Sequence, residues 1–149
     1  MSDTGERRTI YVAEPPPGLR ARTPVVVDCS VISAVVFDEA SRDDAVARLA
    51  GHSLHAPWLL DHELVSVALK KLRGGWSPES IELGLQSYAS HSISRYQTRA
   101  ILQVELAERY GLSSYDAAYL CVASALQAPL ATFDRKLAVA ASRLLSGPA

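Results

Sequence analysis

Cysteine is scarce in this sequence, and its two copies stand far apart. Cys29 and Cys121 are the only cysteines among 149 residues, and neither forms a CxxC pair or joins a cluster of histidines. This excludes the usual patterns of a structural zinc site. Both cysteines lie in apolar stretches, which is typical of small buried side chains in a reduced, cytoplasmic protein.

A surplus of one charge sign is missing as well. The chain has 15 lysines and arginines against 16 aspartates and glutamates, for a formal net charge of −1. This balance excludes a protein that holds nucleic acid by positive charge alone. It does not exclude an enzyme that acts on nucleic acid, because bound divalent metal ions bring positive charge of their own.

Long apolar runs are absent, although 48% of the residues are hydrophobic. No stretch is long enough to cross a membrane, and the polar start "MSDTGERRT" lacks the apolar core of a secretion signal. We therefore expect a cytoplasmic location and no membrane partner. The length and the hydrophobic content are those of one domain with a sizeable core.

Proline is concentrated near the N-terminus. The stretch "EPPPGLR" favours extended, solvated chain, and it predicts an N-terminal extension over residues 1–23, with "TIYV" at 9–12 as a candidate short strand. The folded domain is expected over residues 24–149.

From residue 24 onward, short β-branched runs alternate with helical patterns. Strands are expected at 25–28, 54–57, 91–96 and 129–133, and helices at 30–37, 41–51, 58–73, 77–90, 97–111, 115–128 and 134–145. Strands separated by helices pair in parallel and carry helices on both faces. The sequence therefore predicts an α/β fold, a three-layer α/β/α sandwich around a central parallel sheet of four to five short strands.

Acidic residues follow two of these predicted strands. Asp28 ends the run "VVVD", and Asp134 follows "PLATF". A carboxylate at the end of a buried strand needs a strong partner or a cation, and ligands of such sheets bind beyond the carboxyl ends of the strands. Both residues are also good helix N-caps, and capping alone would account for Asp134. Ser30 is a candidate cap for the first helix.

Two further acids lie on predicted helices. Asp116 stands three residues after Ser113, which is the spacing of a capping box, so capping and function explain it equally well. Glu63 shares a helix face with Ser66 and Lys70, and most glutamates on helices are simply solvated. Taken singly, neither residue establishes a site.

The four acids together point to one chemistry. Clustered carboxylates repel one another unless a cation lies between them. Hard oxygen ligands of this kind suit Mg²⁺ or Mn²⁺ better than zinc. The matching reaction is metal-assisted hydrolysis of a phosphodiester bond.

The order of these stretches resembles the PIN domain, and in particular the VapC-type toxins of bacterial toxin–antitoxin pairs. The resemblance covers about residues 24–143. It rests on the motifs "VVVDCS", "ELVSVALKKLR", "LSSYDAAYL" and "LATFDRKL", of which the last two are the most specific. These motifs place Asp28, Glu63, Asp116 and Asp134, in that order, at the positions of the family's four acids.

The resemblance implies a Mg²⁺- or Mn²⁺-dependent endoribonuclease, the toxin of a type II pair, which a cognate antitoxin holds inactive and which is usually a homodimer. The four acids would be both the catalytic and the metal-binding residues. Ser66 departs from the pattern, because asparagine is frequent there. The proline-rich extension is also atypical of such compact toxins.

Supporting residues follow from the same motifs. Three hydroxyl residues are candidates for orienting the acids or a bound water: Ser30, Ser66 and Thr132. Basic residues that flank the acids are candidate RNA contacts: Lys70, Lys71, Arg73, Arg135 and Lys136. Residues 58–60 and the apolar face of 78–89 are candidates for a groove that takes an antitoxin helix or a second copy of the chain.

Other classes of protein also gather acids at the edge of such a sheet. A haloacid-dehalogenase-like phosphatase would carry a second aspartate two positions after Asp28, where Ser30 stands. A receiver-type phosphoacceptor domain would carry an acidic pair before the first strand's aspartate and a lysine after a late strand, and neither is evident. The remaining alternative is a catalytically weak PIN-like module that acts as a protein- or RNA-binding scaffold, against which the presence of all four acids counts.

Overall fold

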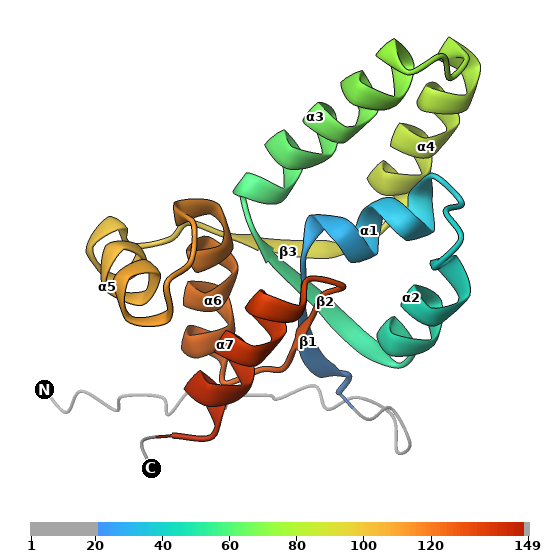
Figure 1. The fold of residues 1–149 in the computed structure, drawn as a ribbon. Coiled ribbons are helices and arrows are strands. Elements are labelled where there is room, and N and C mark those ends of the chain that lie inside the picture. Colours follow the sequence, from blue (N-terminus) through green and yellow to red (C-terminus); the bar gives the residue numbers. More distant parts are fainter. Residues whose placement is uncertain (1–20, 148–149) are drawn as a thin grey trace, which may run out of the picture.

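The computed structural model describes residues 21–147, and in this part of the chain a parallel sheet lies between two groups of helices (Figure 1). The strands are β1 (Thr23–Val27), β2 (His52–Pro57), β3 (Ile93–Tyr96) and β4 (Leu130–Ala131). Their order across the sheet is β3-β2-β1-β4, and every neighbouring pair is parallel. The prediction of an α/β/α sandwich is confirmed, with four strands in the described residues.

The helices separate into two groups. They are α1 (Cys29–Val36), α2 (Arg42–Leu49), α3 (Leu59–Arg73), α4 (Pro78–Ser90), α5 (Ala100–Tyr110), α6 (Ser114–Leu126) and α7 (Arg135–Leu145). Helix α6 packs on the sheet with α5 and α7 beside it, while α1 to α4 lie together on the other side (Figure 1). Helices α3 and α4 form a hairpin that extends away from the sheet.

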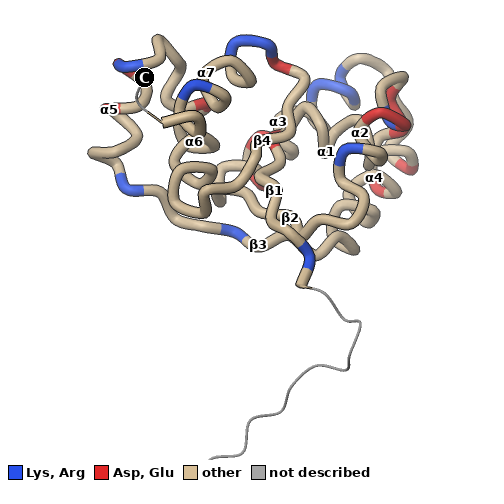
Figure 2. Tube along the Cα trace, turned by 90° about the horizontal axis from the view of Figure 1, so that it is seen from below, with Lys and Arg blue, Asp and Glu red and all other residues tan. Residues whose placement is uncertain are grey.

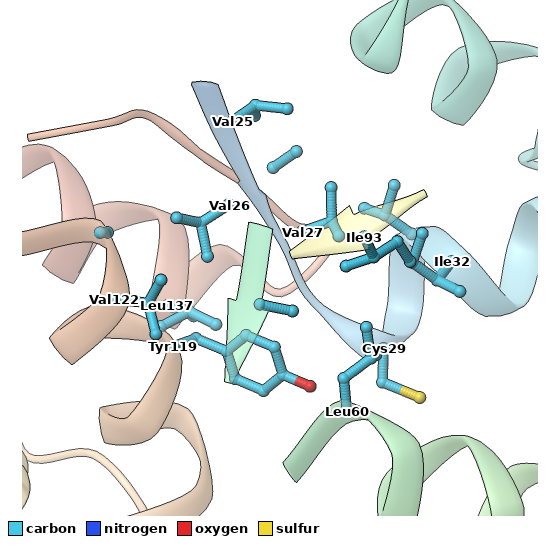
Figure 3. Packing of buried hydrophobic residues seen from close by; sticks show 14 of the residues in the cluster. Val25, Val26, Val27, Cys29, Ile32, Leu60, Ile93, Tyr119, Val122 and Leu137 are labelled. Carbon is cyan, nitrogen blue, oxygen red and sulfur yellow. The ribbon is translucent and has the colours of Figure 1, made fainter. Parts of the chain in front are cut away.

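Strand β1 is buried on both faces, which explains its run of valines. Val26 points toward Val122 and Leu137 on α6 and α7, whereas Val27 points toward Ile32 on α1 (Figure 3). Val26 and Val27 are both 0% exposed. The chain that follows β1 therefore begins in the interior of the molecule, and Asp28 is its first residue.

The helix starts agree only in part with the sequence patterns. Ser113 caps α6, as its spacing from Asp116 indicated, and Ser77 caps α4; their hydroxyls accept from the backbone N–H of Asp116 and Ser80, each at 3.1 Å. Ser41 precedes α2 but makes no capping hydrogen bond. Helix α2 also ends at Leu49 rather than at residue 51, and β4 has only two residues of the predicted 129–133.

The predicted extension lies mostly outside the described residues. The candidate strand at 9–12 falls there entirely, and β1 begins at Thr23, one residue before the predicted start of the domain. The domain boundary stays a prediction. Among residues 21–147, no helix combines the length and the apolar character needed to cross a membrane.

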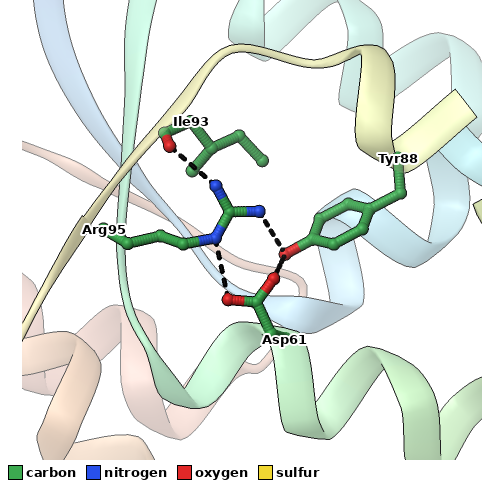
Figure 4. A network of polar contacts seen from close by, with 4 residues as sticks. All are labelled: Asp61, Tyr88, Ile93 and Arg95. Atoms are coloured by element: carbon green, nitrogen blue, oxygen red, sulfur yellow. Dashed lines mark hydrogen bonds and ion pairs between the residues drawn. The ribbon is translucent and has the colours of Figure 1, made fainter.

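A polar network holds the α3–α4 hairpin to the edge of the sheet (Figure 4). Arg95 on β3 donates from Nε to Asp61 Oδ2 at 2.8 Å and from Nη2 to the Tyr88 hydroxyl at 2.9 Å. The Tyr88 hydroxyl in turn donates to Asp61 Oδ1 at 2.7 Å. Partial burial works against ionisation of Asp61, but hydrogen bonds from Arg95 and Tyr88 outweigh it and lower the pKa of this carboxyl.

We predict that Asp61→Asn lowers the free energy of unfolding at pH 7 by roughly 1 kcal/mol, because a charge-assisted pair becomes a weaker neutral one. The pKa of Asp61 is lowered in the folded protein, so its contribution is complete above the unfolded-state pKa and disappears as the pH falls through the folded-state pKa. Urea unfolding of both proteins from pH 7 down to pH 3 should therefore show the difference shrinking below about pH 4.

Asp44 on α2 is exposed, so Asp44→Asn serves as the control. It should change the free energy of unfolding less than Asp61→Asn does. A difference between Asp61→Asn and the unmodified protein that stays constant down to pH 3 would contradict the assigned role of the charge.

Candidate active site

Asp28 lies at the carboxyl end of β1 and caps helix α1. Its carboxylate is 7% exposed. Oδ1 accepts hydrogen bonds from the Val31 N–H at 3.2 Å and the Ser30 hydroxyl at 2.7 Å, and Oδ2 accepts from the Thr132 hydroxyl at 2.5 Å. The cap of α1 is thus Asp28 and not Ser30, because the longer carboxylate of the residue before the helix reaches the N–H at the third position.

The two hydroxyls that contact Asp28 also hold the connection between β4 and α7. Ser30 Oγ accepts from the Phe133 N–H at 3.1 Å, and Thr132 Oγ1 accepts from the Asp134 N–H at 2.9 Å. The ends of β1 and β4 are therefore joined through the side chain of Asp28. Ser30 and Thr132 contact this acid as expected, whereas the exposed Ser66 donates to the carbonyl of His62 in its own helix at 3.2 Å.

Glu63 reaches the same region from α3. Its Oε1 is buried, and within the described residues it has no hydrogen-bond partner. The hydroxyl of Tyr119 on α6 is also buried and also lacks a hydrogen-bond partner within the described residues. The Tyr119 side chain is 1% exposed. An unpaired buried polar group costs about 1–3 kcal/mol, so both groups reduce the stability of the metal-free protein.

The causes of the pKa shifts place three of the acids within electrostatic range of one another. Burial is the main cause of the raised pKa of Asp28; the hydrogen bonds from Thr132, Ser30 and Val31 oppose it, and the charge of Asp116 adds to it.

For Glu63, burial again raises the pKa most. The nearby Tyr119 hydroxyl lowers it in part, although the two groups do not meet hydrogen-bond geometry, and the charges of Asp28 and Asp116 raise it. Asp28, Glu63 and Asp116 come from the β1–α1 junction, α3 and α6, and none of the ion pairs among residues 21–147 involves them. Figure 2 shows acidic positions near the ends of β1 and β4.

Asp134 is the outlying member of the predicted quartet. It is exposed, and its Oδ1 accepts from the Leu137 N–H at 3.0 Å as the cap of α7. The Thr132 hydroxyl links the two acids, because it accepts from the Asp134 N–H and donates to Asp28. Three of the four acids therefore influence one another electrostatically, and the fourth, Asp134, lies at the end of β4.

The chemistry of these acids fits a hard divalent cation, although they do not form a closed ligand set. In the described part of the chain, no three carboxylate, histidine or cysteine groups converge enough to hold one ion. The unpaired oxygen of Glu63 and the mutual repulsion of the three charges are nevertheless what a cation would relieve. A bound ion would have to draw these side chains inward.

The two cysteines are buried, as predicted, at 7% and 4% exposure. Cys29 borders the acids, and burial raises the pKa of its thiol to about 12, with the charges of Glu63, Asp28 and Glu39 adding to the effect. The raised pKa disfavours the thiolate, which is the form of cysteine that acts as a nucleophile.

Four of the five basic candidates are exposed around this site. They lie in the C-terminal half of α3 and the first turn of α7: Lys70, Arg73, Arg135 and Lys136. Figure 2 shows the basic stretch at the start of α7 next to an acidic position.

Lys71, the fifth candidate, is occupied within the fold. Its Nζ lies 2.9 Å from Glu39 Oε1 and stands over the rings of Trp76 and Phe37, at 4.4 Å and 5.3 Å from their centroids. The charge of Lys71 is therefore already paired within the fold, and its assignment as an RNA contact stays a prediction.

The apolar groove predicted around residues 58–60 also needs correction. Leu60 is 0% exposed and belongs to the core, whereas Trp58 is 56% exposed with the Arg95 guanidinium 5.9 Å from its ring. The helical face at 78–89 does border a hollow of about 440 Å³, which is lined by α4 and by one residue of α3. Its lining residues are Leu72, Pro78, Ile81, Glu82, Leu85, Gln86 and Ala89.

The comparison with known families agrees with this α/β fold. The chain fits the PIN domain family over residues 25–142, and it belongs to this family. The solved structure of PAE2754 from Pyrobaculum aerophilum has the same fold: its TM-score is 0.63 at 21% identity, over 91% of this chain and 96% of that one.

Relatives of this chain within the family carry the name VapC. The chain is 30% identical over 115 residues to VapC ribonuclease Mb0985 of Mycobacterium bovis and, to the same extent, to ribonuclease VapC9 of Mycobacterium tuberculosis. The match covers 76% of this chain and 87% of each relative.

Tyr119 is the residue of this region that the motifs did not single out as functional. A signal was present, because Tyr119 stands three residues after Asp116 and so lies on the same face of the helix. An apolar helix face with an aromatic residue is usually core, and the sequence does not reveal that this hydroxyl has no partner.

We predict that Glu63→Gln stabilises the metal-free protein by roughly 1 kcal/mol, because it removes a buried charge that lies near two others. Thermal unfolding in the presence of a chelator should show a higher midpoint than for the unmodified protein. Glu105→Gln, on the exposed face of α5, is the control and should leave the midpoint unchanged. A lower midpoint for Glu63→Gln would mean that this charge stabilises the fold.

Thr132→Val should have the opposite effect, since it leaves the buried Asp28 carboxylate without one of its donors. We expect a loss of about 1–3 kcal/mol in the free energy of unfolding, measured by urea denaturation. Thr98→Val is the matched control: Thr98 donates to the neutral Gln103 side chain at 2.8 Å, so its loss should be smaller. Equal losses for both variants would show that the charge of Asp28 adds nothing to this bond.

Proposed function

We propose that this protein is a Mg²⁺- or Mn²⁺-dependent endoribonuclease, the toxin of a type II toxin–antitoxin pair. Its place in the PIN domain family and its relatives named as ribonucleases support this. The observation that carries the proposal is the crowding of Asp28, Glu63 and Asp116 beyond the end of β1, with no basic side chain paired to them among residues 21–147.

In this proposal Asp28, Glu63 and Asp116 hold the ion, and Asp134 completes the quartet. Oδ1 of Asp134 already caps α7, so its other oxygen is the one that would face the ion. When bound, the ion would supply an activated water and stabilise the charge that develops on the phosphate. Ser30 and Thr132 fix both oxygens of Asp28, which keeps this ligand in a single orientation.

The exposed basic residues would contact the RNA backbone. Arg135 and Lys136 directly follow Asp134. Lys70 and Arg73 lie two to three turns along α3 from Glu63, which is about 10–15 Å. RNA lying along α3 would meet these charges away from the reactive phosphate, so few phosphates would be contacted and the salt dependence of binding would be modest.

A cognate antitoxin and a second copy of the chain are the protein partners in this proposal. Exposed apolar side chains support such contacts, because they are costly to leave in water. They lie on the α3–α4 hairpin, at Val65, Leu69, Leu72 and Leu83, and on α5, at Ile101 and Val104.

One observation favours a second candidate, a catalytically weak PIN-like module that binds RNA or protein as a scaffold. The acids of residues 21–147 are not assembled into a three-ligand set. Such a module would bind its partner without turnover, and the same cleavage experiment separates it from the enzyme.

We predict that the purified protein cleaves members of a panel of structured RNAs only when Mg²⁺ or Mn²⁺ is present. Asp28→Asn, Glu63→Gln and Asp116→Asn should each lower the rate by more than about 100-fold, because a metal ligand is lost. Glu105→Gln is the control and should cleave at the original rate.

Cleavage that persists in a chelator, or that survives Asp28→Asn and Asp116→Asn undiminished, would overturn the enzyme assignment. Binding of RNA without any cleavage in either metal would favour the scaffold.

A further inference from the structure

Tyr119 carries a buried hydroxyl that the fold leaves unpaired. The side chain is 1% exposed and is one of the largest fully buried side chains in the described chain. Within residues 21–147 its hydroxyl has no hydrogen-bond partner. Buried hydroxyls are almost always paired, because water is lost without compensation otherwise, so this exception requires an explanation.

The hydroxyl points toward the part of the molecule that holds the acids. Figure 3 shows it directed from α6 toward Cys29, next to Asp28, and toward Leu60 at the start of α3. Glu63 lies three residues after Leu60 and therefore on the same face of α3. Its Oε1 is the other buried side-chain atom of the described residues that lacks a partner.

The two unpaired groups are complementary, since a tyrosine hydroxyl donates and a carboxylate accepts. They are also close enough to affect each other. After burial, the Tyr119 hydroxyl is the strongest influence on the pKa of Glu63, and the charge of Glu63 is likewise the next influence on the raised pKa of Tyr119.

We propose that Tyr119 is a positioning residue, whose hydroxyl donates to Glu63 Oε1 and so holds the other carboxylate oxygen toward the metal ion. This inference rests on the proposed function, in which Glu63 is a metal ligand. A carboxylate that is fixed by a second partner does not have to lose rotational freedom when the ion binds. Removal of such a partner typically costs about 10–100-fold in metal affinity or activity.

Tyr119→Phe tests the proposal, because it removes only the hydroxyl. The Kd for Mg²⁺ measured by calorimetry, and the Mg²⁺ concentration that half-activates RNA cleavage, should both rise about tenfold or more. The KM for RNA at saturating Mg²⁺ should not change. The unfolding midpoint in a chelator should not fall, because the hydroxyl has no partner in the metal-free protein.

Tyr88→Phe is the matched control. Its hydroxyl bonds Asp61 and Arg95, so the same substitution should lower the unfolding midpoint and leave the Mg²⁺ requirement unchanged. A Tyr119→Phe variant that behaves like Tyr88→Phe, or that matches the unmodified protein in Mg²⁺ affinity, would overturn the positioning role.

A double-mutant cycle with Glu63→Gln makes the test specific to this pair. Once the carboxylate is gone, adding Tyr119→Phe should weaken Mg²⁺ binding no further; an additional tenfold loss would contradict the proposal.

The binding measurements also separate this inference from the proposed function. If the unmodified protein binds Mg²⁺ but cleaves no RNA, and Tyr119→Phe weakens that binding, the nuclease proposal fails and the positioning role stands. If the unmodified protein cleaves RNA with Mg²⁺ and Tyr119→Phe has no effect, only the positioning role fails. Absence of Mg²⁺ binding to the unmodified protein overturns both.

Discussion

The structure depends on the burial of β1 on both faces. Because helices cover this strand from two sides, its valines form the centre of the core, and the next residue must begin in a region that water does not reach. That residue is Asp28. Its charge is tolerated because three donors from the β1–α1 junction and from Thr132 surround it. The bonds of Ser30 and Thr132 also join the ends of β1 and β4. The position of the Asp28 carboxylate therefore depends on the packing of these two strands.

The acids differ sharply in what they contribute to the fold. Asp61 is paired with Arg95 and Tyr88, its pKa is lowered, and its charge stabilises the α3–α4 hairpin. Glu63, two residues further along the same helix, is unpaired, its pKa is raised, and its charge destabilises the metal-free protein. Groups with perturbed pKa values concentrate at functional sites. The contrast between these neighbours supports a role for Glu63 in binding rather than in folding.

Most of the architecture could be predicted from the sequence because its signals are local. The valine run, the prolines and the serine caps of α4 and α6 are read within a few residues of the elements they define. The arrangement of the site was harder to predict from the sequence. The motifs named Asp28, Glu63, Asp116 and Asp134, but whether each lies free, caps a helix or meets a hydroxyl depends on contacts between distant segments. The pairing of Lys71 with Glu39, Phe37 and Trp76 could not be predicted, because these residues come from other segments. Tyr119 was passed over because an unpaired hydroxyl leaves no trace in a sequence.

The bond between Thr132 and Asp28 joins residues that are 104 positions apart. During synthesis on the ribosome, β1 emerges well before β4, and Asp28 gains this donor only when β4 has been made and has docked. Contacts of such long range form late in folding, because the intervening chain must first be ordered. A nascent or prematurely terminated chain that ends before Thr132 therefore lacks this donor, and the surroundings of Asp28 stay incomplete until β4 has been synthesised.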